Sequence, residues 1–148
     1  MQMESTEAAS LKAGIRPENL RIKSGCEVRV ELSVTEEEIA DFLSHVCEVW
    51  VRTFSNGAKV NHLIAFPEGG SDWRYTGVIT EAEGLLFDSS QWRNVWAVQR
   101  NDAFGSKSFS LDVVGREGLV QQIELTPRSK FEAFQNLVTQ NQTDGNLS

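Results

Sequence analysis

The period of the hydrophobic pattern changes near residue 47, and this change limits the possible fold more than any other feature of the sequence. Before it, four apolar residues recur at helical spacing and fall on one face of a helix: Ile39, Phe42, Leu43 and Val46. After it, over residues 47–54, alternate positions are Cys, Val, Val and Thr, as in a strand with one buried face. The sequence therefore predicts an amphipathic helix that leads directly into a β-strand.

Local signals mark both ends of this unit. Thr35 and Glu38 have the spacing of a capping box, in which side chain and backbone exchange hydrogen bonds at the start of a helix. Asn56-Gly57 is a strong hairpin signal, because both residue types tolerate positive φ. We therefore expect a helix after Thr35, a strand, a two-residue turn and a second strand over 58–66.

The remaining pattern predicts short helices near the N-terminus, further strands and one closing helix. The expected helices are 7–13, a second one opening at Pro17, and 128–139; the further strands are 28–32, 75–80, 84–87, 95–100, 106–114 and 119–125. The expected fold class is α+β, with N-terminal short helices, a long antiparallel β-meander sheet and a C-terminal helix. The 148 residues suit one domain over 11–139, with a flexible N-terminus over 1–10 and a flexible tail over 140–148.

The charge balance excludes two classes of partner. Lys and Arg number 14 against 21 Asp and Glu, which gives a net charge of −7. Binding to nucleic acid or to an anionic membrane calls for a basic patch, so neither is expected. No apolar stretch is long enough for a membrane span, and the first ten residues lack the pattern of a secretory signal. We expect a cytoplasmic protein in which Cys26 and Cys47 are free, buried thiols.

No enzyme motif accompanies these elements, because the phosphate-binding loop, the nucleophile elbow and the HExxH pattern are all missing from the sequence. The two histidines are therefore the scarce chemical groups. His45 lies near the C-terminal end of the predicted helix, where an imidazole suits the helix dipole. We assign it a structural role and do not expect an enzyme.

His62 has two possible roles. Counting outward from the turn places it opposite Val51 and on the same strand face as Val60 and Ile64. One interpretation is a core histidine with a hydrogen-bonded ring. The other is an axial ligand presented to a flat, apolar cofactor, because neutral imidazole is the common ligand of haem iron.

Aromatic and cationic residues gather at two further places. Trp50, Arg52 and Phe54 lie on the other face of the same hairpin, and Trp92 precedes a strand that contains Arg100. Such residues suit a porphyrin ring with its propionates, and they suit a subunit interface equally well. The residues alone leave both uses open.

The order of these motifs resembles that of the HemS/ChuX-like family of bacterial haem-utilisation proteins. The resemblance begins at 11–20 with a short helix-turn-helix and is clearest over 84–98, where an apolar strand, a short break and a Trp-containing strand follow one another. It continues through 108–115 and 121–138. It covers about residues 11–139 and is carried by the shared order of weak motifs.

The resemblance implies a HemS/ChuX-like fold of the single-module ChuX/HutX type. It implies a cytoplasmic haem-binding or haem-carrier protein in haem utilisation or iron homeostasis, and a homodimer whose two sheets complete the architecture. The family's axial histidine belongs to the strand after the first hairpin. Our register places Val60 at that position, with His62 two residues along on the same strand face.

The resemblance also implies roles for individual residues. Haem is the expected cofactor, and the expected haem-binding residues are His62 as the ligand of the metal, Arg52 and Arg100 as partners of the propionates, and Trp50, Phe54 and Trp92 against the ring. Some relatives degrade haem, but no dedicated acid, base or redox group is visible in this sequence. Two alternatives keep the fold without haem ligation: a non-catalytic protein-interaction module that uses the Trp/Arg face, and a pocket for another apolar small molecule.

Overall fold

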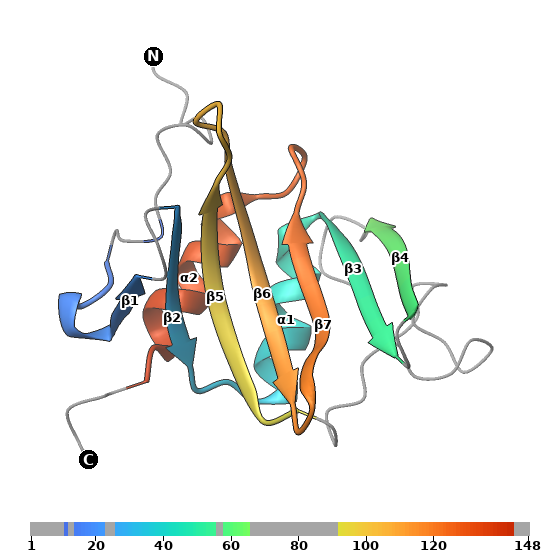
Figure 1. Cartoon of the computed structure of the whole chain (residues 1–148), viewed down its shortest axis with the longest axis horizontal. Coiled ribbons are helices and arrows are strands. Elements are labelled where there is room, and N and C mark those ends of the chain that lie inside the picture. The colour runs from blue at the N-terminus through green and yellow to red at the C-terminus, as the bar shows by residue number, and fades with distance from the viewer. Residues whose placement is uncertain (1–10, 12–13, 23–25, 56–57, 66–91, 144–148) are drawn as a thin grey trace.

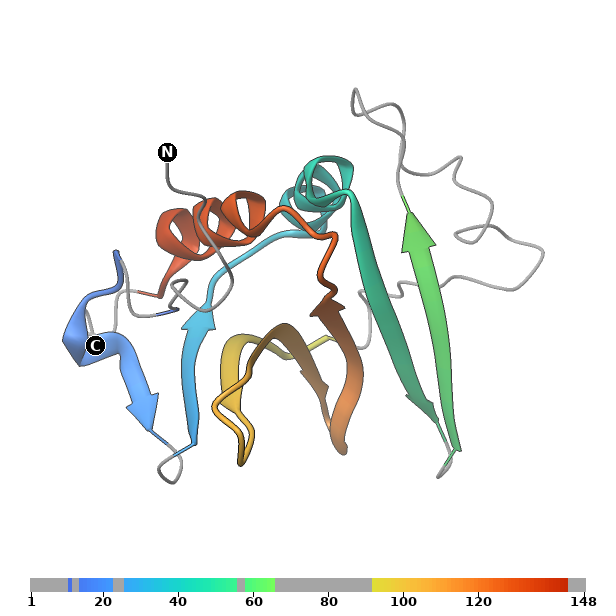
Figure 2. The same ribbon diagram turned by 90° about the horizontal axis from the view of Figure 1, so that it is seen from above.

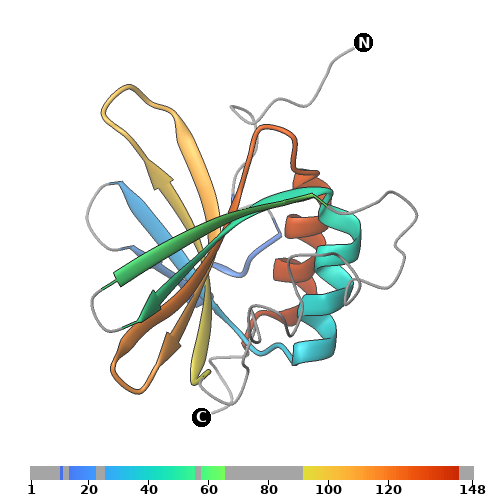
Figure 3. The ribbon, with the colours of Figure 1, turned by 90° about the vertical axis from the view of Figure 1, so that its right-hand side faces the viewer.

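The computed structural model of the chain describes residues 11, 14–22, 26–55, 58–65 and 92–143. Its elements, in chain order, are the 3-10 turn η1 (Pro17–Asn19), β1 (Leu20–Ile22), β2 (Glu27–Leu32), α1 (Glu36–Val46), β3 (Glu48–Ser55), β4 (Ala58–Ala65), β5 (Asn94–Asn101), β6 (Lys107–Gly115), β7 (Gly118–Leu125) and α2 (Phe131–Asn141). The described strands form one antiparallel sheet, and both helices lie on the same side of it (Figures 1 and 3).

The sheet joins distant parts of the chain in the order β1-β2-β5-β6-β7-β3-β4. Strands β5, β6 and β7 follow one another as a meander. The β3–β4 hairpin attaches to β7 through β3, while β2 pairs with β5 (Figure 1). The predicted α+β class, with an antiparallel sheet and a closing helix, is confirmed.

Helix α1 begins as its sequence predicts. The backbone N–H of Glu38 donates to Thr35 Oγ1 at 3.2 Å, and the backbone N–H of Thr35 donates to Glu38 Oε1 at 2.8 Å. This is a complete capping box. The four apolar residues of the helical stripe are all at most 3% exposed: Ile39, Phe42, Leu43 and Val46.

The hairpin also has the predicted register. Ser55 pairs with Ala58, and Val51 pairs with His62. Val49, Val51 and Ile64 are at most 1% exposed. This face of the hairpin therefore belongs to the core.

The helix predicted to open at Pro17 is present but short. Pro17 opens a single 3-10 turn, and the chain then enters β1, which pairs with β2. The backbone N–H groups of this short segment thus find partners in the sheet, and tertiary pairing overrides local propensity. The expected helix 7–13, apart from Leu11, and the expected strands 75–80 and 84–87 lie outside the described residues.

Cys47 occupies an unusual position between α1 and β3. Its φ of 85° lies in the left-handed region, so it forms the end of the helix rather than the first residue of the strand. Neither cysteine forms a disulfide, but Cys26 is exposed and Cys47 is half-buried, so the expectation of buried thiols is wrong for Cys26. In the part of the chain that the structure describes, neither helix is long and apolar enough to cross a membrane.

Gly14 allows a close approach between the N-terminal segment and α2. Its φ is +79°, and a Cβ built there would lie 2.7 Å from Thr139 Cγ2. Nearby, the side chain of Gln142 holds the same segment: its Oε1 accepts from Asn19 Nδ2 at 2.8 Å, and its Nε2 donates to the Gly14 carbonyl at 3.2 Å. These contacts fix residues 14–19 against the end of α2.

We expect Gly14→Ala to lower the free energy of unfolding by about 2 kcal/mol or more, through the positive φ and the steric overlap together. The matched control is Gly105→Ala, because Gly105 has a φ of +86° and open space around a built Cβ. The control should lower the free energy of unfolding by only about 1–2 kcal/mol, which is the cost of the positive φ alone. Urea unfolding of both variants measures the difference in stability. Equal losses would show that the Thr139 side chain moves to accommodate the new methyl group without a free-energy cost.

Candidate functional site

The two faces of the sheet have different surroundings. We call the face that α1 and α2 cover the inner face, and the opposite one the outer face (Figures 2 and 3). Val49, Val51 and Ile64 lie on the inner face with His62. Trp50 and Arg52 alternate with these residues along β3, so their side chains lie on the outer face.

His62 lies at the inner face near the edge of the described sheet. The helices cover the middle of the sheet, while the hairpin of β3 and β4 extends past them (Figure 1). His62 is consequently half-buried, between the fully buried Ile64 and Val60, which is 51% exposed. The imidazole is therefore not sealed inside the globule.

Two polar side chains lie near His62 on the inner face. Thr53 pairs with Val60 across the hairpin and with Gln121 on β7. Gln121 Nε2 donates to Thr53 Oγ1 at 3.3 Å, and Gln121 is only 2% exposed. Together with Val60, Thr53 and Gln121, His62 forms a part-exposed corner, which we call the His62 corner.

A connected belt of side chains crosses the outer face from β3 to β2. We call it the outer belt, and its members are Arg52, Glu124, Gln122, Asp112, Arg100, Glu27 and Arg29. It contains three arginines and three carboxylates, so its net charge is zero. Each charge is therefore compensated within the same chain.

Arg52 occupies the β3 end of the outer belt. Its Nη1 pairs with Glu124 and donates to Gln122 Oε1 at 3.2 Å. Gln122 Nε2 in turn donates to Asp112 Oδ1 at 3.1 Å. Arg52 is thus held by an acid and an amide of its own sheet.

Arg100 occupies the middle of the belt. Its Nη2 donates to Asp112 Oδ2 at 2.8 Å, and its Nε lies 3.2 Å from Glu27 Oε1. Burial alone would lower the pKa of Arg100, but the hydrogen bond and charge of Asp112, followed by those of Glu27, outweigh it and raise the pKa above its ordinary value. The guanidinium therefore stays charged at every physiological pH.

The structure does not bring the six expected haem-binding residues together. His62 lies at the inner face, whereas Arg52, Trp50, Phe54 and Arg100 have the register of the outer face. The sheet separates the two groups, so one haem beside His62 cannot contact both groups within a single chain. Both arginines are also already paired with carboxylates.

Trp92 lies apart from both groups. It is half-buried at the start of β5, packs against the core and lines a hollow with Leu32 and Val34. β5 is separated from β4 by three strands in the sheet order. Trp92 and His62 therefore do not share a site.

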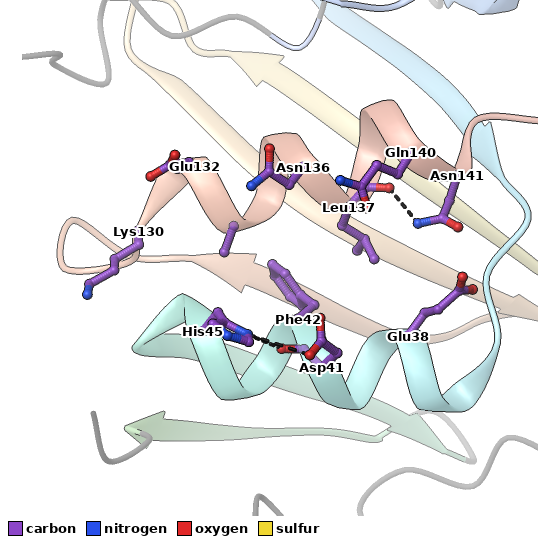
Figure 4. Close-up of a pocket in the computed structure, with 11 residues that line it drawn as sticks. Glu38, Asp41, Phe42, His45, Lys130, Glu132, Asn136, Leu137, Gln140 and Asn141 are labelled. Atoms are coloured by element: carbon purple, nitrogen blue, oxygen red, sulfur yellow. Dashed lines mark hydrogen bonds and ion pairs between the residues drawn. The ribbon is translucent and has the colours of Figure 1, made fainter. Parts of the chain in front are cut away.

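The other histidine lies in a groove between the helices. The groove measures about 520 Å³, and its floor includes Phe42 and Leu137 (Figure 4). His45 Nδ1 lies 2.8 Å from the carbonyl of Asp41 and 3.7 Å from its Oδ1, in a side chain that is 64% exposed. The structural role expected for His45 agrees with this contact at the end of α1.

The acids of the outer belt are the feature that the sequence analysis missed. Asp112 interrupts an apolar strand, and its side chain is only 5% exposed. An acid on the less apolar face of a long strand is a usable signal for a buried ion pair. Its partners Arg100 and Gln122 come from neighbouring strands, so only the sheet order identifies them.

Comparison with known proteins supports the fold. No known protein-family model matches the sequence, and no curated protein sequence matches it either. Among solved structures, the haem-degrading enzyme ChuS of Escherichia coli O157:H7 superposes with a TM-score of 0.60 at 18% identity, over 81% of this chain and 36% of ChuS. A second ChuS structure, described as an E. coli haem oxygenase, has a TM-score of 0.60 at 16% identity, over 81% of this chain and 37% of that one.

A third similar structure is holo-PhuS, a haem-binding protein from Pseudomonas aeruginosa. Its TM-score is 0.56 at 17% identity, over 78% of this chain and 34% of PhuS. The match thus spans only about a third of the length of each solved protein. The fold of this chain is therefore the α+β fold found within ChuS and PhuS.

Proposed function

We propose that this chain binds haem and that His62 is the axial ligand of the iron. The observation that supports this most is a half-buried imidazole at a mostly apolar sheet face, beside the half-exposed Val60. Neutral imidazole is a common ligand of haem iron. The likeness of the fold to ChuS and PhuS, which are described as a haem-degrading enzyme and a haem-binding protein, supports the proposal.

The His62 corner fits a haem in part. Val60 presents exposed hydrocarbon beside the imidazole, which suits a flat apolar ring, while Val51 lies opposite His62 and is buried. Haem, when bound, would supply the iron, while the chain itself would supply the ligand nitrogen and the apolar surface. Besides His62, the described inner-face positions of β3 and β4 include no cation, so the propionates would project away from this face.

The proposed role is that of a haem carrier in haem utilisation in the cytoplasm. Binding and orientation are the tasks that an imidazole and an apolar surface perform. Haem degradation is not part of the proposal.

The decisive experiment is a hemin titration of the whole chain. We expect the wild type to give a sharp Soret band that saturates at one equivalent, and His62→Ala to lose it. His45→Ala is the matched control, because His45 is the other histidine of the chain and lies on α1. His62→Gly with added imidazole should recover the band, since free imidazole can replace the missing ligand.

Three results would contradict the assignment. A spectrum that is the same in the wild type and in His62→Ala would mean that hemin only adsorbs to apolar surface. Loss of the band in His45→Ala alone would move the ligand to α1. Failure of imidazole to restore the band in a folded His62→Gly chain would mean that His62 does not ligate the iron.

We further propose that the chain forms a homodimer through the outer face. In the described part of the chain, no helix covers this face (Figure 3). Two chains that each carry a charge of −7 repel one another over most of their surfaces. The outer belt has equal numbers of both signs, already paired, so a second copy can approach there at a low electrostatic cost.

Two positions on β4 separate the haem proposal from the dimer proposal. Leu63 is 49% exposed and pairs with Trp50 on the outer face, whereas Val60 is 51% exposed on the inner face. Leu63→Lys should weaken the dimer by about tenfold or more and leave hemin binding unchanged, because it buries an unpaired charge at the interface. Val60→Lys should weaken hemin binding and leave the dimer unchanged.

Sedimentation velocity over a range of concentrations measures the first effect, and hemin titration measures the second. If Leu63→Lys sediments as the wild type does, the outer face is not the dimer interface. If Val60→Lys binds hemin like the wild type, the haem does not lie at the His62 corner.

A non-catalytic interaction module is the second candidate function. The observation in its favour is the aromatic and charged outer face, where Arg29 lies 5.3 Å above the ring of Trp96. This candidate replaces the first if hemin fails to bind specifically while Leu63→Lys still abolishes association.

A further inference from the structure

A second hollow lies at the end of β2 and β5, far from His62. It measures about 450 Å³, a volume typical of small-molecule sites, and its lining includes Glu31, Leu32, Val34, Trp92, Arg93 and Val95. We call it the β2–β5 hollow. Five strand spacings separate β2 from β4 in the sheet order, which corresponds to about 24 Å. The hollow is therefore independent of the proposed haem site.

One side of this hollow is lined by apolar residues that belong to the core or pack against it. Leu32 and Val95 are 5% and 6% exposed, and both belong to the core. Val34 and Trp92 are partly buried and pack against that core. An apolar group of a ligand would therefore meet a preformed surface, so little ordering would accompany binding.

Opposite charges also line the hollow without pairing. Glu31 and Arg93 both contribute to it, yet no ion pair joins them, and Arg93 is exposed with no carboxylate partner among the residues that the structure describes. Glu31 Oε2 accepts a hydrogen bond from Asn94 Nδ2 at 2.8 Å. This bond anchors the carboxylate and leaves its other oxygen able to accept from a ligand.

The indole of Trp92 adds an unsatisfied donor. Its Nε1 is buried and makes no hydrogen bond to any described residue. A buried N–H group without an acceptor is costly, so an acceptor is expected to reach it. Trp92 is among the residues that line the hollow, so this unsatisfied donor lies next to it.

We propose that the β2–β5 hollow binds a zwitterionic amino acid with an apolar side chain. Its carboxylate pairs with the guanidinium of Arg93 and accepts from Trp92 Nε1, and its ammonium group donates to Glu31. Its side chain packs against Leu32, Val34 and Val95. A ligand with both charges satisfies both unpaired groups at once, which a simple acid or amine cannot do.

Nuclear magnetic resonance of the indole N–H groups tests this proposal with L-leucine as the probe. The chain has four Trp residues, so its ¹⁵N-labelled form gives four indole signals, and Trp92→Phe identifies the signal of Trp92. We expect millimolar L-leucine to move that signal in a saturable way. Two analogues, 4-methylpentanoate without the ammonium and isopentylamine without the carboxylate, should bind about tenfold more weakly or worse.

Two variants test the charges directly. Arg93→Gln and Glu31→Gln should each weaken L-leucine binding about tenfold, while the matched control Arg116→Gln, at an exposed residue of the β6–β7 turn, should bind as the wild type does. His62→Ala should also bind L-leucine normally, which keeps this test separate from the haem proposal. No saturable movement of the Trp92 signal, equal binding of isopentylamine, or unchanged binding by folded Arg93→Gln would overturn the proposal.

Discussion

Phe134→Ala is expected to lower the free energy of unfolding by about 3–5 kcal/mol, because it leaves a large cavity where the two helices meet the sheet. Phe134 is 1% exposed, and its ring centroid lies 5.8 Å from that of Phe131, 5.8 Å from that of Phe109 and 6.5 Å from that of Phe42. These partners belong to α2, β6 and α1. One side chain therefore connects all three elements.

Urea unfolding followed by circular dichroism measures this loss. Phe104→Ala is the matched control, because Phe104 is 92% exposed in the β5–β6 turn. It removes the same atoms and should change stability by no more than about 0.5 kcal/mol. If the two variants lose similar amounts, the packing of α2 against the sheet is not what stabilises this fold.

Asp112→Ala is expected to lower the free energy of unfolding by about 3 kcal/mol or more. The carboxylate is 5% exposed and accepts from Arg100 Nη2 at 2.8 Å, from Ser110 Oγ at 2.8 Å and from Gln122 Nε2 at 3.1 Å. Its removal leaves these donors without their acceptor and leaves Arg100 with Glu27 as its remaining acidic partner. The outer belt then loses its central acid.

A double variant tests whether the unpaired charge of Arg100 causes this loss of stability. Asp112→Leu combined with Arg100→Met removes both charges, so it should recover much of the stability that Asp112→Ala loses. Glu117→Ala, at an exposed acid of the β6–β7 turn, is the control and should stay within about 0.5 kcal/mol of the wild type. If the double variant is no more stable than Asp112→Ala, the loss comes from packing and not from an unpaired charge.

Local signals in the sequence predicted local structure well. The capping box of Thr35 and Glu38 involves atoms three residues apart, and the register of Val51 with His62 follows from a two-residue turn. Both are fixed by short-range geometry, so the sequence pattern is sufficient. The strand that contains Arg100 was predicted for the same reason, from its own alternating pattern.

The helix predicted to open at Pro17 has only three residues, because a tertiary contact limits it. A proline suits the first turn of a helix, but the residues after it pair with β2 and form β1. The residues around His62 in the candidate site were predicted from the sequence, but the partners of the two arginines were not. The placement of His62 beside Val60 followed from the hairpin, whereas the partners of Arg52 and Arg100 are acids on other strands.

The sequence by itself determined the start of α1 at Thr35, the register of the hairpin and the residues that share a face with His62. These depend on contacts between neighbours along the chain, which alternation and turn chemistry specify. Only the tertiary structure decided that β3 lies beside β7, that Asp112 meets Arg100, and that Arg52 and Arg100 belong to one belt of ion pairs on the outer face. Pairing between distant strands depends on how the whole chain buries its apolar faces, and no local pattern contains that information.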